Sequence, residues 1–248
     1  MTATLSNLTP AELVGLAGEP PEHVLALWSL CPRHPFYFLE HFCYTADQHD
    51  MEHPIKRFPI DRPYLRHMTQ LWIDNPLLVV VKSRQMIMTW LFTALYLWDA
   101  MFHNGRLIMF QSKREEDAIG DETSGDGMLG RAKFMVNHIP YRDVLLPARA
   151  GKGELPAVVT LGKRILFPRR GSTLWAIPQG PSIIRQRTAS GYYGDESGFQ
   201  PEAEDAYAAM RPTIRGGGRA TFVTTAGMVD KGFTRRLYED RLTDMEAA

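Results

Sequence analysis

The segment LLVVVKSRQMIMTW, from Leu77 to Trp90, has the residue types and spacing of a phosphate-binding site. An apolar run ends at Lys82, a polar turn follows, and the chain then resumes with helical spacing. A buried strand, a turn and a long helix can bind phosphate because the backbone N–H groups of the turn and the positive end of the helix converge on an anion. Thr89 stands where such loops carry the hydroxyl residue that contacts magnesium.

The segment departs from the standard pattern G-x-x-x-x-G-K-S/T at two positions. Ile87 replaces the second glycine, and Met88 replaces the lysine. The cation that a phosphate needs must therefore come from Lys82 or Arg84, at the front of the loop. Because a β-branched residue resists a positive φ angle, we expect the loop to turn differently at Ile87. Taken alone, the segment also fits an ordinary strand, turn and helix.

Two later segments supply groups that a nucleotide hydrolase needs. Asp195 and Glu196 end a short apolar segment, and hydrolysis requires one carboxylate near magnesium and another to orient or deprotonate the attacking water. We expect the two side chains to point to opposite sides of an extended strand end and so to have different roles. Thr224 and Thr225 end another strand, where hydroxyls could sense a γ-phosphate. An acidic surface turn and an ordinary threonine-rich strand are the alternatives.

The pattern of apolar residues predicts elements that alternate along the chain. Strands are expected at residues 77–81, 106–112, 191–196 and 219–226, with a hairpin at 163–178. Helices are expected within residues 8–30, 62–73, 90–102, 113–122, 130–139 and 201–214. The run at 77–81 is typical of a strand covered on both faces. Strands separated by helices predict an α/β protein with a mainly parallel sheet, in which ligands bind at the carboxyl ends of strands.

Composition excludes several classes of protein. Lys+Arg and Asp+Glu number 28 each, so there is no global basic field, and nucleic-acid binding would need a local patch. The amino-terminal segment lacks the basic flank and apolar run of a signal peptide, and no apolar stretch is long enough to span a bilayer. Two cysteines make no disulfide framework, which favours a reducing, cytosolic setting.

Cys31, His34, His41 and Cys43 are close together in the sequence and are types that bind zinc. Their spacing matches no common structural zinc pattern, and aromatic residues are interleaved with them. Two buried, apolar cysteines are therefore the preferred interpretation, with zinc as the alternative.

Four arginines have alternative interpretations. Arg185 and Arg187 could contact DNA, act as an arginine finger across subunits, or lie on a solvated loop. Arg169 and Arg170, in the predicted hairpin turn, are interpreted as solvated side chains.

Five segments, taken in order, resemble the ATPase domain of the large terminase subunit, the DNA-packaging motor of tailed bacteriophages. They are HPFYFLEHF, FPIDRPYLRHMTQLW, KSRQMIMTW, WAIPQGPSIIRQRTAS and GDESGFQPEAEDAYAAMRPTIRGGGRATFVTTAG, and the resemblance covers residues 35–235. The first two resemble the family's lead-in, and the third resembles its divergent Walker A loop, in which a basic residue at the front often replaces the usual lysine. The last two resemble the segment before the acidic motif and the Walker B motif with its coupling motif.

The resemblance implies a RecA-like ASCE P-loop ATPase fold and a site for ATP and Mg²⁺. The implied nucleotide-binding residues are those of the whole loop: Lys82, Ser83, Arg84, Gln85, Met86, Ile87, Met88, Thr89 and Trp90. Among them, Lys82 or Arg84 would contact the phosphates. The family often has a glutamine before the first strand that reads adenine, and Gln70 is a weak candidate for it.

The resemblance also implies roles for the later segments. Asp195 would hold magnesium together with Thr89, and Glu196 would activate water. The coupling motif, which links hydrolysis to DNA movement, falls on Thr224, Thr225 and Ala226. Gly194, in front of the acidic pair, departs from the family, which usually has an apolar strand residue there.

As a member of this family the chain would hydrolyse ATP to drive double-stranded DNA into a procapsid. Its partners would be DNA, the portal protein and the small terminase subunit, in a homo-oligomeric ring at the portal vertex in the host cytoplasm. Isolated domains of this kind tend to be monomers. The expected organisation is a lead-in at residues 1–60, a P-loop ATPase core at 61–234, and a linker at 235–248 toward a nuclease domain that the sequence lacks.

Two alternatives remain open. One is a degenerate terminase-like fragment that binds without hydrolysing ATP, which Ile87 and Met88 favour. The other is a P-loop translocase of another branch, which would require a second RecA-like domain.

Overall fold

The centre of the computed structural model, which describes residues 16–121, 123–148 and 153–225, is a mainly parallel β-sheet. Its order is β3-β9-β8-β4-β7-β6-β5. The strands are β3 (Leu77–Lys82), β4 (Leu107–Gln111), β5 (Val159–Leu161), β6 (Arg164–Phe167), β7 (Ser172–Ala176), β8 (Gly191–Gly194) and β9 (Arg219–Thr225). The first five strands in this order are parallel, and β6 and β5 extend the sheet antiparallel. The predicted α/β class, with a mainly parallel sheet flanked by helices, is confirmed.

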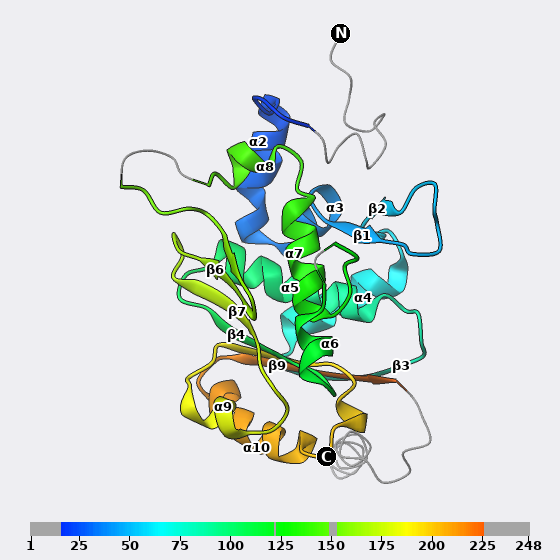
Figure 1. Ribbon diagram of the computed structural model, residues 1–248, viewed down its shortest axis with the longest axis vertical. Coiled ribbons are helices and arrows are strands. Elements are labelled where there is room, and N and C mark those ends of the chain that lie inside the picture. Colours follow the sequence, from blue (N-terminus) through cyan, green and yellow to red (C-terminus); the bar gives the residue numbers. More distant parts are fainter. Residues whose placement is uncertain (1–15, 122, 149–152, 226–248) are drawn as a thin grey trace.

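Helices cover both faces of this sheet (Figure 1). On one face lie α4 (Pro63–Asp74), α5 (Met88–Phe102), α6 (Glu115–Ile119), α7 (Met128–Asn137) and α8 (Arg142–Leu145), and on the other lie α9 (Ser182–Gln186) and α10 (Ala203–Arg215). Alternate residues of one strand therefore enter different cores. In β4, Ile108 and Phe110 join the core that contains α5, while Met109 joins the core beneath α10. The helices predicted at 62–73, 90–102, 130–139 and 201–214 are confirmed.

Helix α5 is the central helix of the larger core. It is buried on nearly all sides from Leu91 to Phe102, because the sheet lies on one side of it and other helices lie on the rest. The chain that precedes the sheet supplies part of this cover through α2 (Glu22–Leu30), a short 3₁₀ turn (Cys31–Arg33) and α3 (Pro35–His41). Trp98 of α5 donates a hydrogen bond from Nε1 to the Cys31 carbonyl at 2.6 Å. The lead-in and the region around the sheet thus share one core.

The lead-in also contains an antiparallel hairpin that the sequence did not predict, β1 (Tyr44–Ala46) with β2 (Ile55–Arg57). Lys56 holds its loop in place, since the ammonium lies 2.7 Å from Asp47 Oδ2 and 3.1 Å from Asp50 Oδ2. A third unpredicted strand, β5, is mostly exposed.

Both cysteines are buried, as the preferred interpretation expects. Burial raises the pKa of the Cys31 thiol to about 12, which disfavours the thiolate that binds zinc. The Cys43 thiol contacts the Met135 sulfur at 3.2 Å, and His34 uses Nδ1 to accept a hydrogen bond from the Phe36 N–H at the start of α3. Among the described residues, no group of three or more His, Cys, Asp or Glu side chains is placed to hold a metal ion.

The expectation that β3 is covered on both faces holds for most of the strand, since Leu78 and Val80 pack in the core that contains α5 and Leu77 and Val79 pack against the core beneath α10. Within the described chain β3 is nevertheless an edge strand that pairs only with β9, and Val81, near its carboxyl end, is 51% exposed. In the same described ranges, no helix combines the length and the apolar character that crossing a membrane requires.

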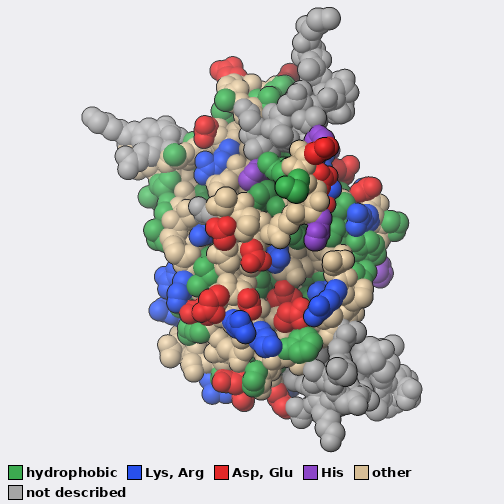
Figure 2. All heavy atoms as spheres, turned by 45° about the vertical axis from the view of Figure 1, so that its right-hand side comes forward, with side chains coloured by type: hydrophobic (Ala, Val, Ile, Leu, Met, Phe, Trp, Pro, Cys, Tyr) green, Lys and Arg blue, Asp and Glu red, His purple; other side chains and the backbone are tan. Residues whose placement is uncertain are grey.

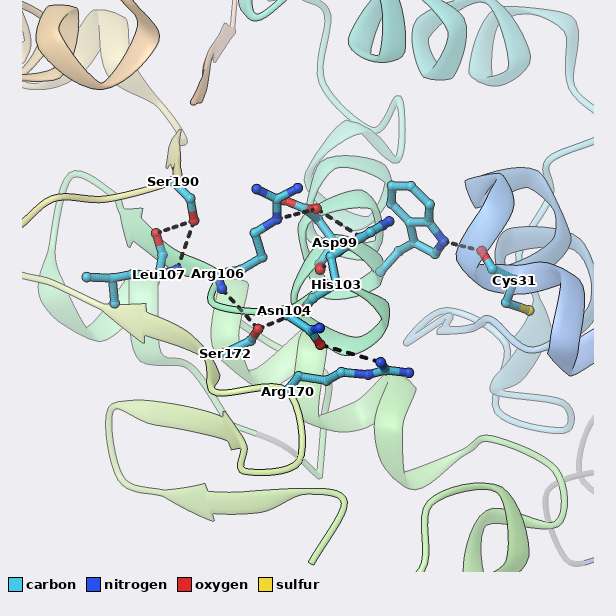
Figure 3. Close-up of polar contacts among 10 residues, drawn as sticks. Cys31, Asp99, His103, Asn104, Arg106, Leu107, Arg170, Ser172 and Ser190 are labelled. Carbon is cyan, nitrogen blue, oxygen red and sulfur yellow. Dashed lines mark hydrogen bonds and ion pairs between the residues drawn. The ribbon is translucent and has the colours of Figure 1, made fainter. Parts of the chain in front are cut away.

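Polar contacts hold the turn that leads from α5 into β4 (Figure 3). Arg106 donates from Nε to Asp99 Oδ1 at 3.1 Å, and its backbone N–H donates to Ser172 Oγ at 3.0 Å. The Leu107 N–H donates to Ser190 Oγ at 2.8 Å. The side chains of Ser172 and Ser190, at the starts of β7 and β8, thereby align the start of β4 with the starts of its two neighbours. The carboxyl ends of the three strands are aligned with one another as a consequence.

Candidate nucleotide site

The loop between β3 and α5 has an unusual backbone. Gln85 has φ 61° and Ile87 has φ 57°, which are left-handed conformations that favour glycine. The expectation that the loop would turn differently at Ile87 is therefore wrong: the residue takes the positive φ that a glycine would take. Its side chain is partly buried against the main core, and this packing offsets part of the backbone strain.

The Thr89 hydroxyl, in the first turn of α5, donates to Asp195 Oδ2 at 2.8 Å. These residues are 106 apart in the sequence, and the parallel sheet brings them together because β3 and β8 both end at this edge. Asp195 follows the last residue of β8, and its backbone is held on both sides. Its N–H donates to the Gln111 carbonyl at 2.9 Å, and its own carbonyl accepts from Gln200 Nε2 at 2.7 Å.

Glu196 lies at the same edge but not as predicted. Strand β8 ends at Gly194, and Glu196 has φ 50°, so the two carboxylates are not on an extended strand. Both instead face the loop. Glu196 Oε1 accepts from the Thr225 hydroxyl at 3.0 Å and lies 3.8 Å from Lys82 Nζ. The left-handed turn makes this possible by redirecting the side chain after the strand ends.

Lys82 is the cation of this group. Its side chain is only 10% exposed, and Nζ lies 3.4 Å from Thr225 Oγ1. The residues of the predicted loop, acidic pair and coupling motif thus form one connected cluster: Lys82, Thr89, Asp195, Glu196 and Thr225. Thr224 lies beside it, where its hydroxyl accepts from the Gly198 N–H at 3.2 Å.

Asp195 is buried in this cluster. Burial raises its pKa above that of an ordinary aspartate, while the Thr89 hydroxyl and the Lys82 ammonium oppose the shift. A buried carboxylate with incomplete compensation is a strong ligand for an incoming cation.

Gly194 has a structural reason to be glycine. A Cβ at this position would lie 3.0 Å from Cε1 and 3.1 Å from the hydroxyl of Tyr192. The Tyr192 ring occupies the space of the missing side chain, and its hydroxyl donates to Gln111 Oε1 at 2.6 Å. The aromatic ring therefore supplies the apolar cover that the strand residue would otherwise provide.

A cavity of about 600 Å³ lies against the loop and extends to the lead-in hairpin. Lys82 and residues 85–90 line it, whereas Ser83 and Arg84 do not. Sequence reasoning did not identify its other walls, which are the β1–β2 hairpin with Gln48, Lys56 and Arg57, and the α6–α7 region with Gly125 and Arg131. Because these residues come from separate elements, no local motif signals them.

The remaining candidates lie elsewhere. Arg84 is exposed, and Gln70 donates to Asp74 on its own helix at 2.9 Å and does not line the cavity. Arg185 and Arg187 line a second cavity, of about 760 Å³, at the amino ends of β4, β8 and β9.

The two hairpin-turn arginines are exposed, as expected, and each also donates a hydrogen bond. Arg169 donates to the Leu155 carbonyl at 2.8 Å, and Arg170 to Asn104 Oδ1 at 3.4 Å. Ala226 lies outside the described residues.

The chain has a mixed α/β fold with a mainly parallel sheet flanked by helices, and a cluster of charged and hydroxyl side chains lies at the carboxyl ends of β3, β8 and β9. No protein-family model and no curated sequence matches the chain. Among solved structures, the large terminase of bacteriophage HK97 is similar, with a TM-score of 0.58 at 14% sequence identity. The match covers 87% of this chain and 42% of the terminase chain. The fold is therefore terminase-like, and the chain corresponds to less than half the length of that protein.

Proposed function

We propose that this chain binds ATP with magnesium at the carboxyl ends of β3, β8 and β9 and hydrolyses it. The observation that carries the proposal is the meeting of two distant segments. Thr89 of the loop lies 2.8 Å from Asp195, and Lys82 lies 3.8 Å from Glu196. A hydroxyl, two carboxylates and a cation beside a turn that leads into a buried helix are the groups that phosphoryl transfer uses.

The Thr89 hydroxyl and the Asp195 carboxylate fit magnesium, which prefers oxygen ligands and is usually bound through one or two carboxylates plus phosphates and waters. Bound there, magnesium would neutralise phosphate charge. Lys82 is already directed toward the cluster and supplies the cation that Met88 cannot.

Glu196 is placed to orient a water molecule for in-line attack on the γ-phosphorus. The new P–O bond forms as the bond to the β–γ bridging oxygen breaks, giving ADP and phosphate, and the carboxylate accepts the proton of the water. Thr225, at the end of β9, holds Glu196 in place at 3.0 Å. A movement of the Glu196 side chain during hydrolysis would therefore reach β9 through this hydrogen bond. A coupling motif requires such a path if it is to link hydrolysis to DNA movement.

We further propose that hydrolysis drives double-stranded DNA, with the portal protein and the small terminase subunit as partners in a ring. The terminase-like fold supports this proposal. On the face that Figure 2 shows, basic side chains are interspersed with acidic ones over the described residues, so a DNA contact there would be local. Arg185 and Arg187, at the opposite edge of the sheet, are candidates for DNA or for the nucleotide of a neighbouring copy.

Ligand-dependent stabilisation tests the nucleotide site. A ligand at 100 times its Kd stabilises a fold by about 2.7 kcal/mol, so Mg-ATP should raise the unfolding temperature of the wild type by several degrees. Lys82→Ala should lose most of this rise, whereas Lys163→Ala, which removes an exposed lysine paired with Glu115, should keep it. No stabilisation of the wild type would contradict the proposal. Stabilisation without turnover would favour the non-hydrolysing binding module.

A further inference from the structure

Arg131 lies in the first turn of α7 and lines the same cavity as Lys82 and Thr89. Its side chain is only 21% exposed, and its Nε is buried with no hydrogen-bond partner in the described chain. Among the described residues, the nearest carboxylate is that of Asp126, which lies 4.0 Å away and has a side chain that is 73% exposed. A largely buried guanidinium with so little compensation is costly to the ligand-free fold.

The surroundings of Arg131 hold it against the loop. Its guanidinium lies over the Trp90 ring, 5.4 Å from the centroid, and Trp90 packs edge-on against Phe134 at 5.6 Å. The loop before α7 is closed by paired backbone hydrogen bonds between Asp121 and Asp126, at 3.1 and 3.2 Å. A cation–π contact does not satisfy the N–H donors of the guanidinium.

Arg131 lies at the end of the cavity where the proposed phosphate-binding residues are. The Trp90 ring, over which the Arg131 guanidinium lies, belongs to the residue directly after Thr89, and Thr89 donates the hydrogen bond to Asp195.

We propose that Arg131 contacts the terminal phosphate of a nucleoside triphosphate bound in the same molecule, an inference that rests on the proposed nucleotide site. The planar guanidinium offers two parallel N–H donors to phosphate oxygens, which a lysine does not. With Met88 in place of the standard lysine, Lys82 and Arg131 together supply the positive charge. Arg131 thereby distinguishes triphosphate from diphosphate.

Equilibrium binding of Mg-ADP and of a magnesium complex of a non-hydrolysable ATP analogue tests this assignment, by calorimetry on the wild type and Arg131→Gln. The variant should bind the analogue about tenfold more weakly or worse, the factor that a charge-assisted hydrogen bond supplies, and ADP within about twofold of the wild type. Arg131→Lys should show an intermediate loss. Lys133→Gln, which removes a charge from the same helix outside the cavity, should bind both ligands normally.

The outcomes separate the two proposals. If the wild type binds neither nucleotide, the nucleotide site itself is wrong and the role of Arg131 is wrong with it. If the wild type binds both and Arg131→Gln binds both equally well, only the role of Arg131 is overturned. An equal loss for both nucleotides also overturns it, because the residue would then act on the base or on the fold. Retained ADP binding shows that the variant is folded.

Discussion

Ile87 carries backbone strain that a glycine would not. At φ 57°, an L side chain costs about 1–2 kcal/mol, whereas glycine costs about 0.5–1 kcal/mol through its freer unfolded state. We therefore expect Ile87→Gly to be more stable than Ile87→Ala by about 0.5–1 kcal/mol, as measured by urea unfolding. At the exposed helical residue Ala208 the order should reverse, with Ala208→Gly destabilising the protein. A more stable alanine at position 87 would mean that the loop does not adopt this conformation.

Asp195 is expected to lower the stability of the ligand-free protein. Burial raises its pKa, so the ionised form is disfavoured in the fold. The contribution of Asp195 to stability should be most favourable below the pKa of an unfolded aspartate and should fall as the pH rises from there through the raised pKa. Asp195→Asn removes this loss and should unfold a few degrees higher than the wild type at neutral pH. The difference should vanish in acid, and thermal unfolding over a pH series measures it. An Asn variant less stable at pH 7 would contradict the burial argument.

The residues of the phosphate site differ in how far the sequence could predict them. Lys82, Thr89 and Asp195 stand at strand ends or helix starts, and such places are visible in the apolar pattern. The backbone angle of Ile87 and the turn at Glu196 were predicted wrongly because tertiary packing overrides a local φ preference. Arg131 could not be found, since its position depends on how α7 packs against α5.

At the scale of elements, the α6–α7 loop depends on close backbone approach. A Cβ on Gly120 would overlap the Asp126 carbonyl oxygen, and φ at Gly120 is 65°. Gly105 has nearly the same angle, 67°, but open space around its Cα. Gly105→Ala should therefore cost about 1 kcal/mol from conformation alone, and Gly120→Ala about 1–3 kcal/mol more from overlap. Denaturant unfolding of the two variants measures the difference, and equal costs would show that the loop is not closed in this way.

The strands with continuous apolar runs were predictable, because a short apolar run bounded by turn residues favours a buried strand over a helix or a loop. The β1–β2 hairpin was not, since its strands are three residues long and β2 is only half-buried. The hairpin and the β3–α5 loop line the same cavity, and local periodicity does not reveal such a relation between distant segments. The edge position of β3 was missed for a similar reason, because an apolar run does not reveal how many neighbours a strand has.

At the scale of the whole molecule, the lead-in and the region around the sheet form one core. Phe38 and Leu39 of α3 are fully buried in the same cluster as Leu91 and Leu95 of α5. The expected organisation places a boundary at residue 60, and a boundary drawn along the sequence does not reveal which segments pack together. Helix α5, which follows the β3–α5 loop, is packed against α3, and this contact supports the loop that precedes it.

The central claim is that the Lys82–Thr225–Glu196 and Thr89–Asp195 contacts form a hydrolytic site. Magnesium-dependent ATP turnover by the purified chain, compared among the wild type, Glu196→Gln and Lys82→Ala, tests it most directly. Glu196→Gln should reduce turnover by about a hundredfold or more, as loss of a general base does, while still binding Mg-ATP. Glu115→Gln, at an exposed ion pair with Lys163, should turn over ATP like the wild type. Turnover that survives both Glu196→Gln and Lys82→Ala would contradict the account.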